Sequence, residues 1–182
     1  MRTKKGFTLL EVLVVVVIAI TVMAFAVPAY KKSQERNRFF AAQGVLIDLG
    51  TAVRGLRTAL VEAQENFTYP SDVTQVLSNW QTNPAGITEE TSLSDITDTN
   101  FPSALFVYKY LSSIPFDNLA DSSYKGYTFY LCPQEEVSDG ACCSSNTPVV
   151  ACMMLPAETE STEYYRAIYK EDGTIVRFSK EN

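Results

Sequence analysis

The apolar run from Phe7 to Val27 contains one charged residue, Glu11. As a helix this run would be about 31 Å long, which is enough to cross the hydrocarbon core of a bilayer. A carboxylate in such a span is costly unless it has a partner, so ionisable residues inside a membrane usually have a function. Glu11 is therefore the first candidate functional residue.

Four cysteines lie within one short stretch near the C-terminus: Cys132, Cys142, Cys143 and Cys152. Four cysteines allow three pairings, and a bond between two adjacent residues is strained. We therefore expect Cys142 and Cys143 each to pair with one of the outer two cysteines. The spacing lacks the two C-x2-C knuckles of a zinc ribbon, so disulfides are favoured over a metal site. Disulfides predict a compartment outside the cytoplasm.

The chain contains no histidine, which excludes Ser-His-Asp and Cys-His catalysis and zinc sites of the H-E-x-x-H type. Three oxygen-bearing side chains in F-D-N-L-A-D are weak candidates for a calcium site: Asp117, Asn118 and Asp121. Their spacing matches no dedicated calcium loop, and solvated turn residues explain them more simply. We predict no enzymatic activity, no cofactor and no resident metal.

The charge balance argues against a nucleic-acid partner, because the 182 residues carry 15 basic and 21 acidic side chains and a net charge of −6. Basic residues do cluster directly after the apolar run, where we expect them to meet lipid head groups: Lys31, Lys32, Arg36 and Arg38. Since basic residues flank the run on both sides, charge alone does not orient it. The predicted disulfides place the C-terminal part outside and the N-terminus in the cytoplasm.

Apolar residues then recur at alternating steps of three and four, which predicts one stripe along a helix. The stripe comprises Phe39, Ala42, Leu46, Leu49, Val53, Leu56, Leu60, Ala63 and Phe67. Together with the apolar run it predicts one helix from Phe7 to Phe67, about 90 Å long, with Pro28 as a kink and Tyr69-Pro70 as the end. Glycines at positions 44, 50 and 55 favour packing of this stripe on a sheet over a free coiled coil.

The pattern beyond residue 70 changes twice. Residues 70–123 predict a polar connection with a short helix from Ser71 to Trp80, a surface loop over 88–100 and a short helix over 103–111. Period-two alternation then predicts strands over 127–132, 163–170 and 174–179, with a hairpin turn at Asp172-Gly173 and a further candidate strand over 149–155. A long helix covering an antiparallel sheet is an α+β fold.

The segment K-K-G-F-T-L-L-E-V-L, followed by a β-branched apolar run and a proline, resembles the N-terminus of type IV prepilins and type II secretion pseudopilins. The resemblance implies that a prepilin peptidase cleaves between Gly6 and Phe7 and methylates the new amino group of Phe7. It also implies that Glu11 meets the N-terminal amine of a neighbouring subunit during assembly, and that Pro28 is the family's kink proline. Cysteine-closed C-terminal regions are common in these pilins.

The resemblance implies a leader at 1–6, a transmembrane and assembly half-helix at 7–30 and a periplasmic or extracellular domain at 31–182. Within that domain we expect helix to about 67, a connecting loop over 68–123, and the sheet with the cysteine region over 124–182. The implied protein waits in a bacterial inner membrane with its domain in the periplasm. It then polymerises with itself or with related subunits into a fibre.

Two alternatives stay open. Ala24-Phe25-Ala26 fits a secretory cleavage site, and cleavage after Ala26 would release a small disulfide-bonded protein. An uncleaved membrane anchor would leave Glu11 unexplained. Within the family, the cysteines favour a pilus subunit, whereas the acidic connecting loop and the I-P-F-D segment favour a type II secretion pseudopilin.

Overall fold

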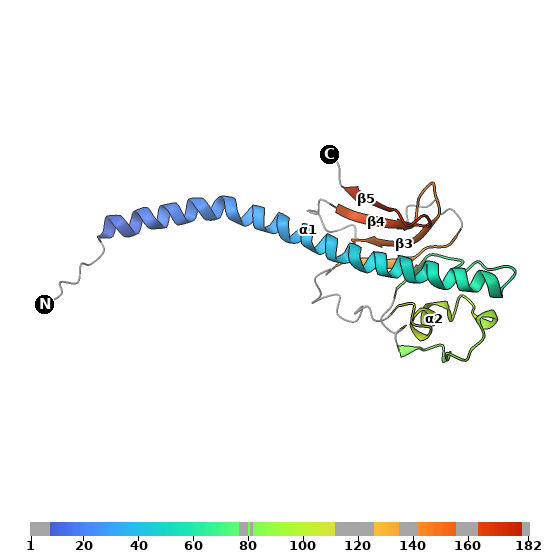
Figure 1. The fold of residues 1–182 in the computed structure, drawn as a ribbon. Coiled ribbons are helices and arrows are strands. Elements are labelled where there is room, and N and C mark those ends of the chain that lie inside the picture. The colour runs from blue at the N-terminus through green and yellow to red at the C-terminus, as the bar shows by residue number, and fades with distance from the viewer. Residues whose placement is uncertain are drawn as a thin grey trace.

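One helix dominates the computed structural model, which describes residues 8–76, 80, 82–111, 126–134, 142–155 and 164–179 (Figure 1). Helix α1 (Leu9–Ala63) has Thr8 as its N-cap and passes through Pro28 without interruption. Proline cannot donate a backbone hydrogen bond and crowds the preceding turn, which favours bending. Figure 1 shows α1 changing direction gently in its first half.

The predicted helix end at Phe67 is wrong, because α1 ends at Ala63 and Gln64 is already extended. The Gln64 side-chain amide donates to the carbonyls of Leu93 and Ile96, at 2.7 and 3.0 Å. Because these two bonds hold Gln64 against a distant loop, the helix ends at the preceding residue. Consequently Ala63, predicted to lie in the buried stripe, is exposed, while Phe67 is buried from outside the helix.

Five strands form one antiparallel sheet in the order β1-β2-β3-β4-β5. Their bounds are β1 (Thr74–Gln75), β2 (Thr128–Leu131), β3 (Val149–Met154), β4 (Tyr164–Lys170) and β5 (Ile175–Ser179). The predicted hairpin is confirmed, since β4 and β5 pair across the turn that contains Asp172 and Gly173. The sheet and the helix together confirm the α+β, pilin-like architecture.

The connection between α1 and β2 differs from its prediction at one end. The expected short helix after Ser71 is replaced by strand β1, which pairs with β2. Ser71 does not cap a helix but donates from its backbone N–H and its hydroxyl to the Asp98 carboxylate. The loop over 88–100 is mostly exposed and includes the short 3-10 helix η2 (Leu93–Asp95), while α2 (Phe101–Val107) replaces the helix predicted over 103–111.

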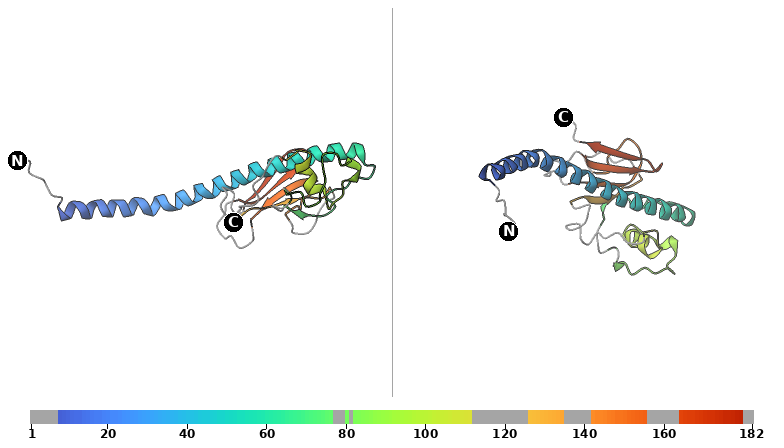
Figure 2. Two further views of the ribbon diagram at one scale, coloured as in Figure 1. Left: turned by 90° about the horizontal axis from the view of Figure 1, so that it is seen from below. Right: turned by 60° about the vertical axis from the view of Figure 1, so that its left-hand side comes forward.

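The C-terminal half of α1 packs on one face of the sheet, against β3 and β4. Figure 1 shows β3 to β5 on one side of this half and α2 on the other, and the second view in Figure 2 agrees. All seven stripe residues from Phe39 to Leu60 are at most 1% exposed. The three-four stripe therefore predicted the helix face of the core correctly. These residues are Phe39, Ala42, Leu46, Leu49, Val53, Leu56 and Leu60.

Gly50 lies where the Tyr169 ring of β4 crosses α1. A Cβ atom placed on Gly50 would lie only 2.8 Å from Cε1 of Tyr169, with two more ring carbons closer still. We expect Gly50→Ala to lower the free energy of unfolding by about 1–3 kcal/mol, because the ring must move out of a packed core. Gly44→Ala is the matched control, since no atom lies within 4 Å of a Cβ at Gly44.

Urea unfolding of the full chain in detergent measures both variants. Gly44→Ala should raise the free energy of unfolding by up to about 1 kcal/mol. If the two variants had equal stability, the close approach of Tyr169 would not be the reason for glycine at position 50.

Tyr127, next to β2, is 3% exposed and donates its hydroxyl to the carbonyl of Tyr164 at 3.1 Å. Burial, with a smaller contribution from the Glu35 carboxylate, raises the pKa of Tyr127 from 10.0 to about 12. Because the folded-state pKa is the higher one, this contribution to stability is complete below pH 10 and is lost as pH rises through 12.

We therefore expect the free energy of unfolding to fall between pH 10 and 12 more steeply in the wild type than in Tyr127→Phe. Urea titrations of both proteins at pH 9, 10 and 11 measure this difference. Parallel pH profiles would show that Tyr127 does not keep its proton in the folded state.

Candidate functional site

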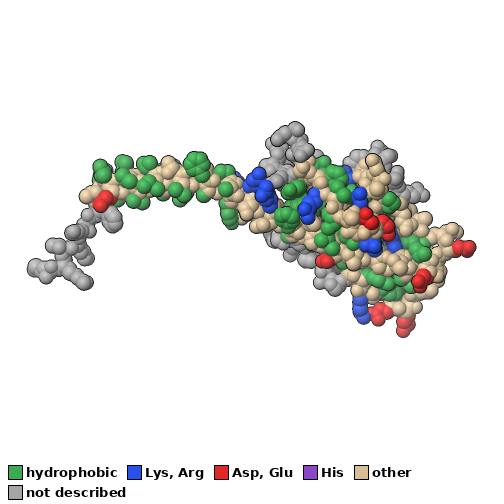
Figure 3. All heavy atoms as spheres, turned by 45° about the horizontal axis from the view of Figure 1, so that its top comes forward, with side chains coloured by type: hydrophobic (Ala, Val, Ile, Leu, Met, Phe, Trp, Pro, Cys, Tyr) green, Lys and Arg blue, Asp and Glu red, His purple; other side chains and the backbone are tan. Residues whose placement is uncertain are grey.

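The first half of α1 carries large apolar side chains that are exposed in the described structure. Their exposed fractions range from 45% at Val14 to 84% at Leu9. Figure 2 shows this half extending away from the rest of the protein, and Figure 3 shows hydrophobic side chains along it, so we call it the apolar rod. Among the described residues, α1 is the one helix that is long and apolar enough to cross a membrane. Because each such side chain gains about 1.5–3 kcal/mol on burial, this half requires lipid or another protein around it.

Glu11 lies in the first turn of this rod, and its carboxylate is bound by Thr8. The backbone N–H and the hydroxyl of Thr8 both donate to Oε2 of Glu11, at 2.8 and 2.9 Å, and the Glu11 N–H donates back to the Thr8 hydroxyl at 3.3 Å. This reciprocal arrangement is a capping box, which satisfies two backbone donors at the helix start. The negative charge also lies at the positive end of the helix dipole.

Thr8 is a residue that the reading of the sequence missed, although T-L-L-E has the spacing of a capping box. The box fixes the carboxylate at the end of the rod and leaves it able to accept further hydrogen bonds, because a carboxylate offers about four lone-pair positions. Glu11 can therefore accept a cationic partner without first losing Thr8.

The basic cluster follows the apolar rod directly. Figure 3 shows Lys and Arg side chains grouped where the rod meets the rest of the protein. Tyr30, at the end of the rod, is 65% exposed and accepts a hydrogen bond from Gln34 through its hydroxyl. An aromatic residue followed by basic residues is typical of a membrane–water interface.

The two disulfides are Cys132–Cys143 and Cys142–Cys152, with Cα–Cα distances of 5.6 and 5.7 Å. Each of the adjacent cysteines thus pairs with one of the outer two. All four are at most 3% exposed and belong to a second apolar cluster with Val149 and Ile168. This cluster lies on the sheet face that α1 does not cover, so residues 142–148, hereafter the cover segment, bury part of that face.

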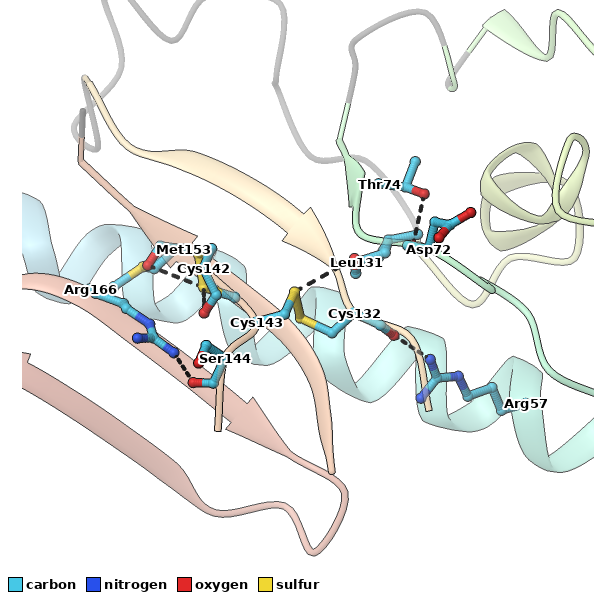
Figure 4. The surroundings of a disulfide bond; sticks show 11 residues. Arg57, Asp72, Thr74, Leu131, Cys132, Cys142, Cys143, Ser144, Met153 and Arg166 are labelled. Atoms are coloured by element: carbon cyan, nitrogen blue, oxygen red, sulfur yellow. Dashed lines mark hydrogen bonds between the residues drawn. A yellow bond between two sulfur atoms is a disulfide. The ribbon is translucent and has the colours of Figure 1, made fainter. Parts of the chain in front are cut away.

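Two arginines hold the surroundings of the disulfides in place (Figure 4). Arg166 of β4 donates to the carbonyl of Ser144 in the cover segment, and its guanidinium lies 4.3 Å from the centre of the Phe178 ring. Arg57 of α1 donates to the carbonyls of Cys132 and Tyr69, at 2.6 and 3.1 Å. Arg57 also pairs with Glu171 at 3.5 Å.

Arg57 is 3% exposed, and burial lowers its pKa to about 10, an effect that Glu171 partly offsets. The sequence reading missed its role. The position of Arg57 in the sequence indicates that it is buried, because it lies four residues after Val53 and three before Leu60, within the apolar stripe. A buried cation in such a stripe needs partners, and here two carbonyls and one carboxylate supply them.

The remaining sequence candidates lie outside the described residues. Gly6 and Phe7, proposed as the cleavage point, precede Thr8, and Asp117, Asn118 and Asp121 fall between residues 111 and 126. Among the residues that the structure does describe, no group of three or more Cys, Asp or Glu side chains could hold a metal ion.

Comparison with known proteins gives one match. No curated protein and no solved structure shows significant similarity to the chain. A family model described as the prokaryotic N-terminal methylation motif matches residues 1–27, which include Glu11 and most of the apolar rod. The chain therefore begins with the motif that marks the precursors of type IV pilins and pseudopilins.

Proposed function

We propose that this protein is the precursor of a structural subunit that polymerises into a type IV pilus. The observation that carries the proposal is the methylation motif at residues 1–27 on a helix whose apolar half is unburied and whose C-terminal half is packed on a sheet. A helix of this kind suits two environments in turn. It is compatible with lipid before assembly and with the helices of other subunits in a fibre.

Processing would occur at the Gly6–Phe7 bond, where a prepilin peptidase removes residues 1–6 and methylates Phe7. Residues 7–30 would then serve as the membrane and assembly segment, and residues 31–182 as the exposed domain. Cleavage creates an amine four residues before Glu11, at the same end of the rod. In hydrocarbon, a carboxylate beside an amine is far more stable than either group alone.

The domain would lie on the periplasmic side of the inner membrane, and the disulfides support this orientation because they form in oxidising compartments. The basic cluster after the rod would then lie at the outer head groups, which are its expected contact before assembly. We favour a pilus subunit over a type II secretion pseudopilin because of the doubly disulfide-bonded region between β2 and β3.

The assembly of the chain in cells with and without a prepilin peptidase tests the proposal. With the peptidase and the assembly machinery of a type IV pilus, we expect the chain in sheared surface fibres that sediment at high speed. Without the peptidase, it should stay in the inner-membrane fraction with its domain accessible to protease from the periplasm. A soluble periplasmic product in both strains would contradict the proposal and support secretion.

A further inference from the structure

The connectivity of the two disulfides is not the one that follows the order of the cysteines along the chain. The first cysteine pairs with the third, and the second with the fourth, so the two covalent loops overlap at Cys142 and Cys143. The sequential alternative would join Cys132 to Cys142 and Cys143 to Cys152. The two connectivities differ only by an exchange between adjacent residues.

Chain statistics do not distinguish these connectivities before the protein folds. The native Cys132 loop has a sequence separation of 11, and the sequential alternative is one residue shorter. Both native loops are one residue longer than their sequential counterparts, and the probability of loop closure falls as the 3/2 power of loop length, so the two connectivities differ only about 1.35-fold. The third connectivity requires a bond between adjacent cysteines, which is strained. An unfolded chain therefore forms the two unstrained connectivities in roughly equal amounts.

The folded sheet is what selects the native connectivity. Cys152 lies in β3 opposite Tyr130, and the backbone N–H of Cys132, just after β2, donates to the carbonyl of Val150 at 3.0 Å. Cys132 and Cys152 thus lie on one face of the strand pair, two residues apart along it. The cover segment crosses this face with Cys142 nearer Cys152 and Cys143 nearer Cys132, and Arg166 holds the next residue, Ser144 (Figure 4).

The contacts of the cover segment form late in folding, because they require β2, β3 and β4 to be paired in register. Before these contacts can form, residues 142–155 and 164–170 must enter the compartment in which the protein folds, after Cys132 has entered it. Once formed, they bury all four sulfur-bearing side chains to 3% exposure or less, out of reach of a thiol. A wrong pairing must therefore be corrected while the sheet is still open.

We propose that this protein is a substrate of a thiol–disulfide exchange catalyst, a dithiol isomerase, during its maturation. The catalyst's thiolate attacks the Cys142 sulfur of a Cys132–Cys142 bond and releases the Cys132 thiolate. Cys132 attacks Cys143 in the Cys143–Cys152 bond and releases Cys152. Cys152 then attacks the mixed disulfide at Cys142, which closes the native bond and regenerates the catalyst. Three thiolate attacks give no net oxidation.

The inference rests on the proposed function only for its compartment, because an oxidising envelope is where the bonds would form. Its chemistry is independent of cleavage at Gly6, of methylation and of fibre assembly. The test below uses the uncleaved full chain, so its result does not depend on whether the protein polymerises.

The full chain, reduced and unfolded in urea with detergent, is refolded in two ways. One sample is oxidised by diamide without free thiol; the other is oxidised in the same way, freed of diamide, and then incubated with a catalytic amount of a reduced dithiol isomerase. Fragmentation mass spectrometry that breaks the backbone between Cys142 and Cys143 reads the connectivity. With diamide alone we expect about half of the molecules to carry the sequential connectivity, and after incubation with the isomerase more than nine-tenths to carry the native one. Native pairing above nine-tenths with diamide alone would overturn the proposal, as would a sequential form that persists with the isomerase.

Two matched double variants separate chain statistics from folding. Cys142→Ser with Cys152→Ser leaves only the native Cys132–Cys143 bond, and Cys143→Ser with Cys152→Ser leaves only the sequential Cys132–Cys142 bond. In urea the two bonds should form at rates within about 1.5-fold of each other. After refolding, the native bond should resist reduction by dithiothreitol at least tenfold longer. A faster closure of the native bond already in urea would show that the local chain directs pairing and that no exchange catalyst is needed.

Discussion

Glu11→Ala is expected to lower the amount of assembled fibre at least tenfold while leaving cleavage between Gly6 and Phe7 intact. The reason is the environment of the carboxylate. In the proposed fibre, the N-terminal amine of a subunit would be surrounded by apolar side chains, and a buried charge without its partner costs several kcal/mol. About 3 kcal/mol corresponds to more than a hundredfold in an association constant. Sheared fibre and cleaved subunit, both quantified by immunoblot, measure the two effects separately.

Two further variants separate the effect of the Glu11 charge from the effect of its capping box with Thr8. Glu11→Gln keeps the size of the side chain and an acceptor for Thr8 but removes the charge, so assembly should fail as in Glu11→Ala. Thr8→Ala removes the hydroxyl of the capping box but keeps the Thr8 N–H that donates to Glu11. It should weaken the helix start by about 1 kcal/mol and leave assembly largely intact. Normal fibre from both Glu11 variants would refute an electrostatic role in assembly.

Arg57→Ala should destabilise the domain by about 2–4 kcal/mol, because a buried carbonyl that loses its donor costs about 1–3 kcal/mol. The substitution deprives the carbonyls of Cys132 and Tyr69 of the Arg57 donor, whereas the Glu171 carboxylate is half exposed and can be solvated. Urea unfolding, followed by the fluorescence of the single buried tryptophan, Trp80, measures the change.

Arg54→Ala is the matched control, because Arg54 lies one turn earlier on α1, is only partly buried and contacts the Tyr169 hydroxyl at 3.4 Å. Its loss should cost less than about 1 kcal/mol. If the Arg57 and Arg54 variants were equally stable, the link between α1 and the disulfide region would contribute little to the fold.

The sequence predicted the parts of the fold that depend on local periodicity. The three-four stripe from Phe39 to Leu60 identified the buried face of α1 because side-chain spacing on a helix is fixed by its own geometry. The same holds for the turn at Asp172 and Gly173 and for the strands around it. Strand β1 was missed because it has only two residues and exists through its pairing with β2, more than fifty residues away.

The remaining differences also come from long-range contacts. The end of α1 depends on two bonds from Gln64 to the loop at Leu93 and Ile96. The disulfide connectivity depends on the register of β2 and β3, since the spacing of Cys142 and Cys143 from the outer cysteines is nearly equal. Arg57 was visible as a basic residue in an apolar stripe, but its partners could only be found in three dimensions.

Of the candidate site, the sequence located Glu11 and its apolar surroundings but not the bond from Thr8. T-L-L-E has the spacing of a capping box, but the same residues open an apolar run, and an apolar run does not by itself indicate that its carboxylate is bound. The structure adds that Glu11 already has a partner in its own helix. In the proposed assembly, the amine of a neighbouring subunit would therefore bind a carboxylate that Thr8 already binds, and not a carboxylate without a partner.

The N-terminal mass of the mature protein shows whether it is processed as a prepilin. The protein is isolated from cells that contain a prepilin peptidase, and its terminal peptide is sequenced by mass spectrometry. We predict a chain that begins at Phe7 and carries one methyl group on its amine. A chain that begins at Val27, or that keeps residues 1–6, would contradict it.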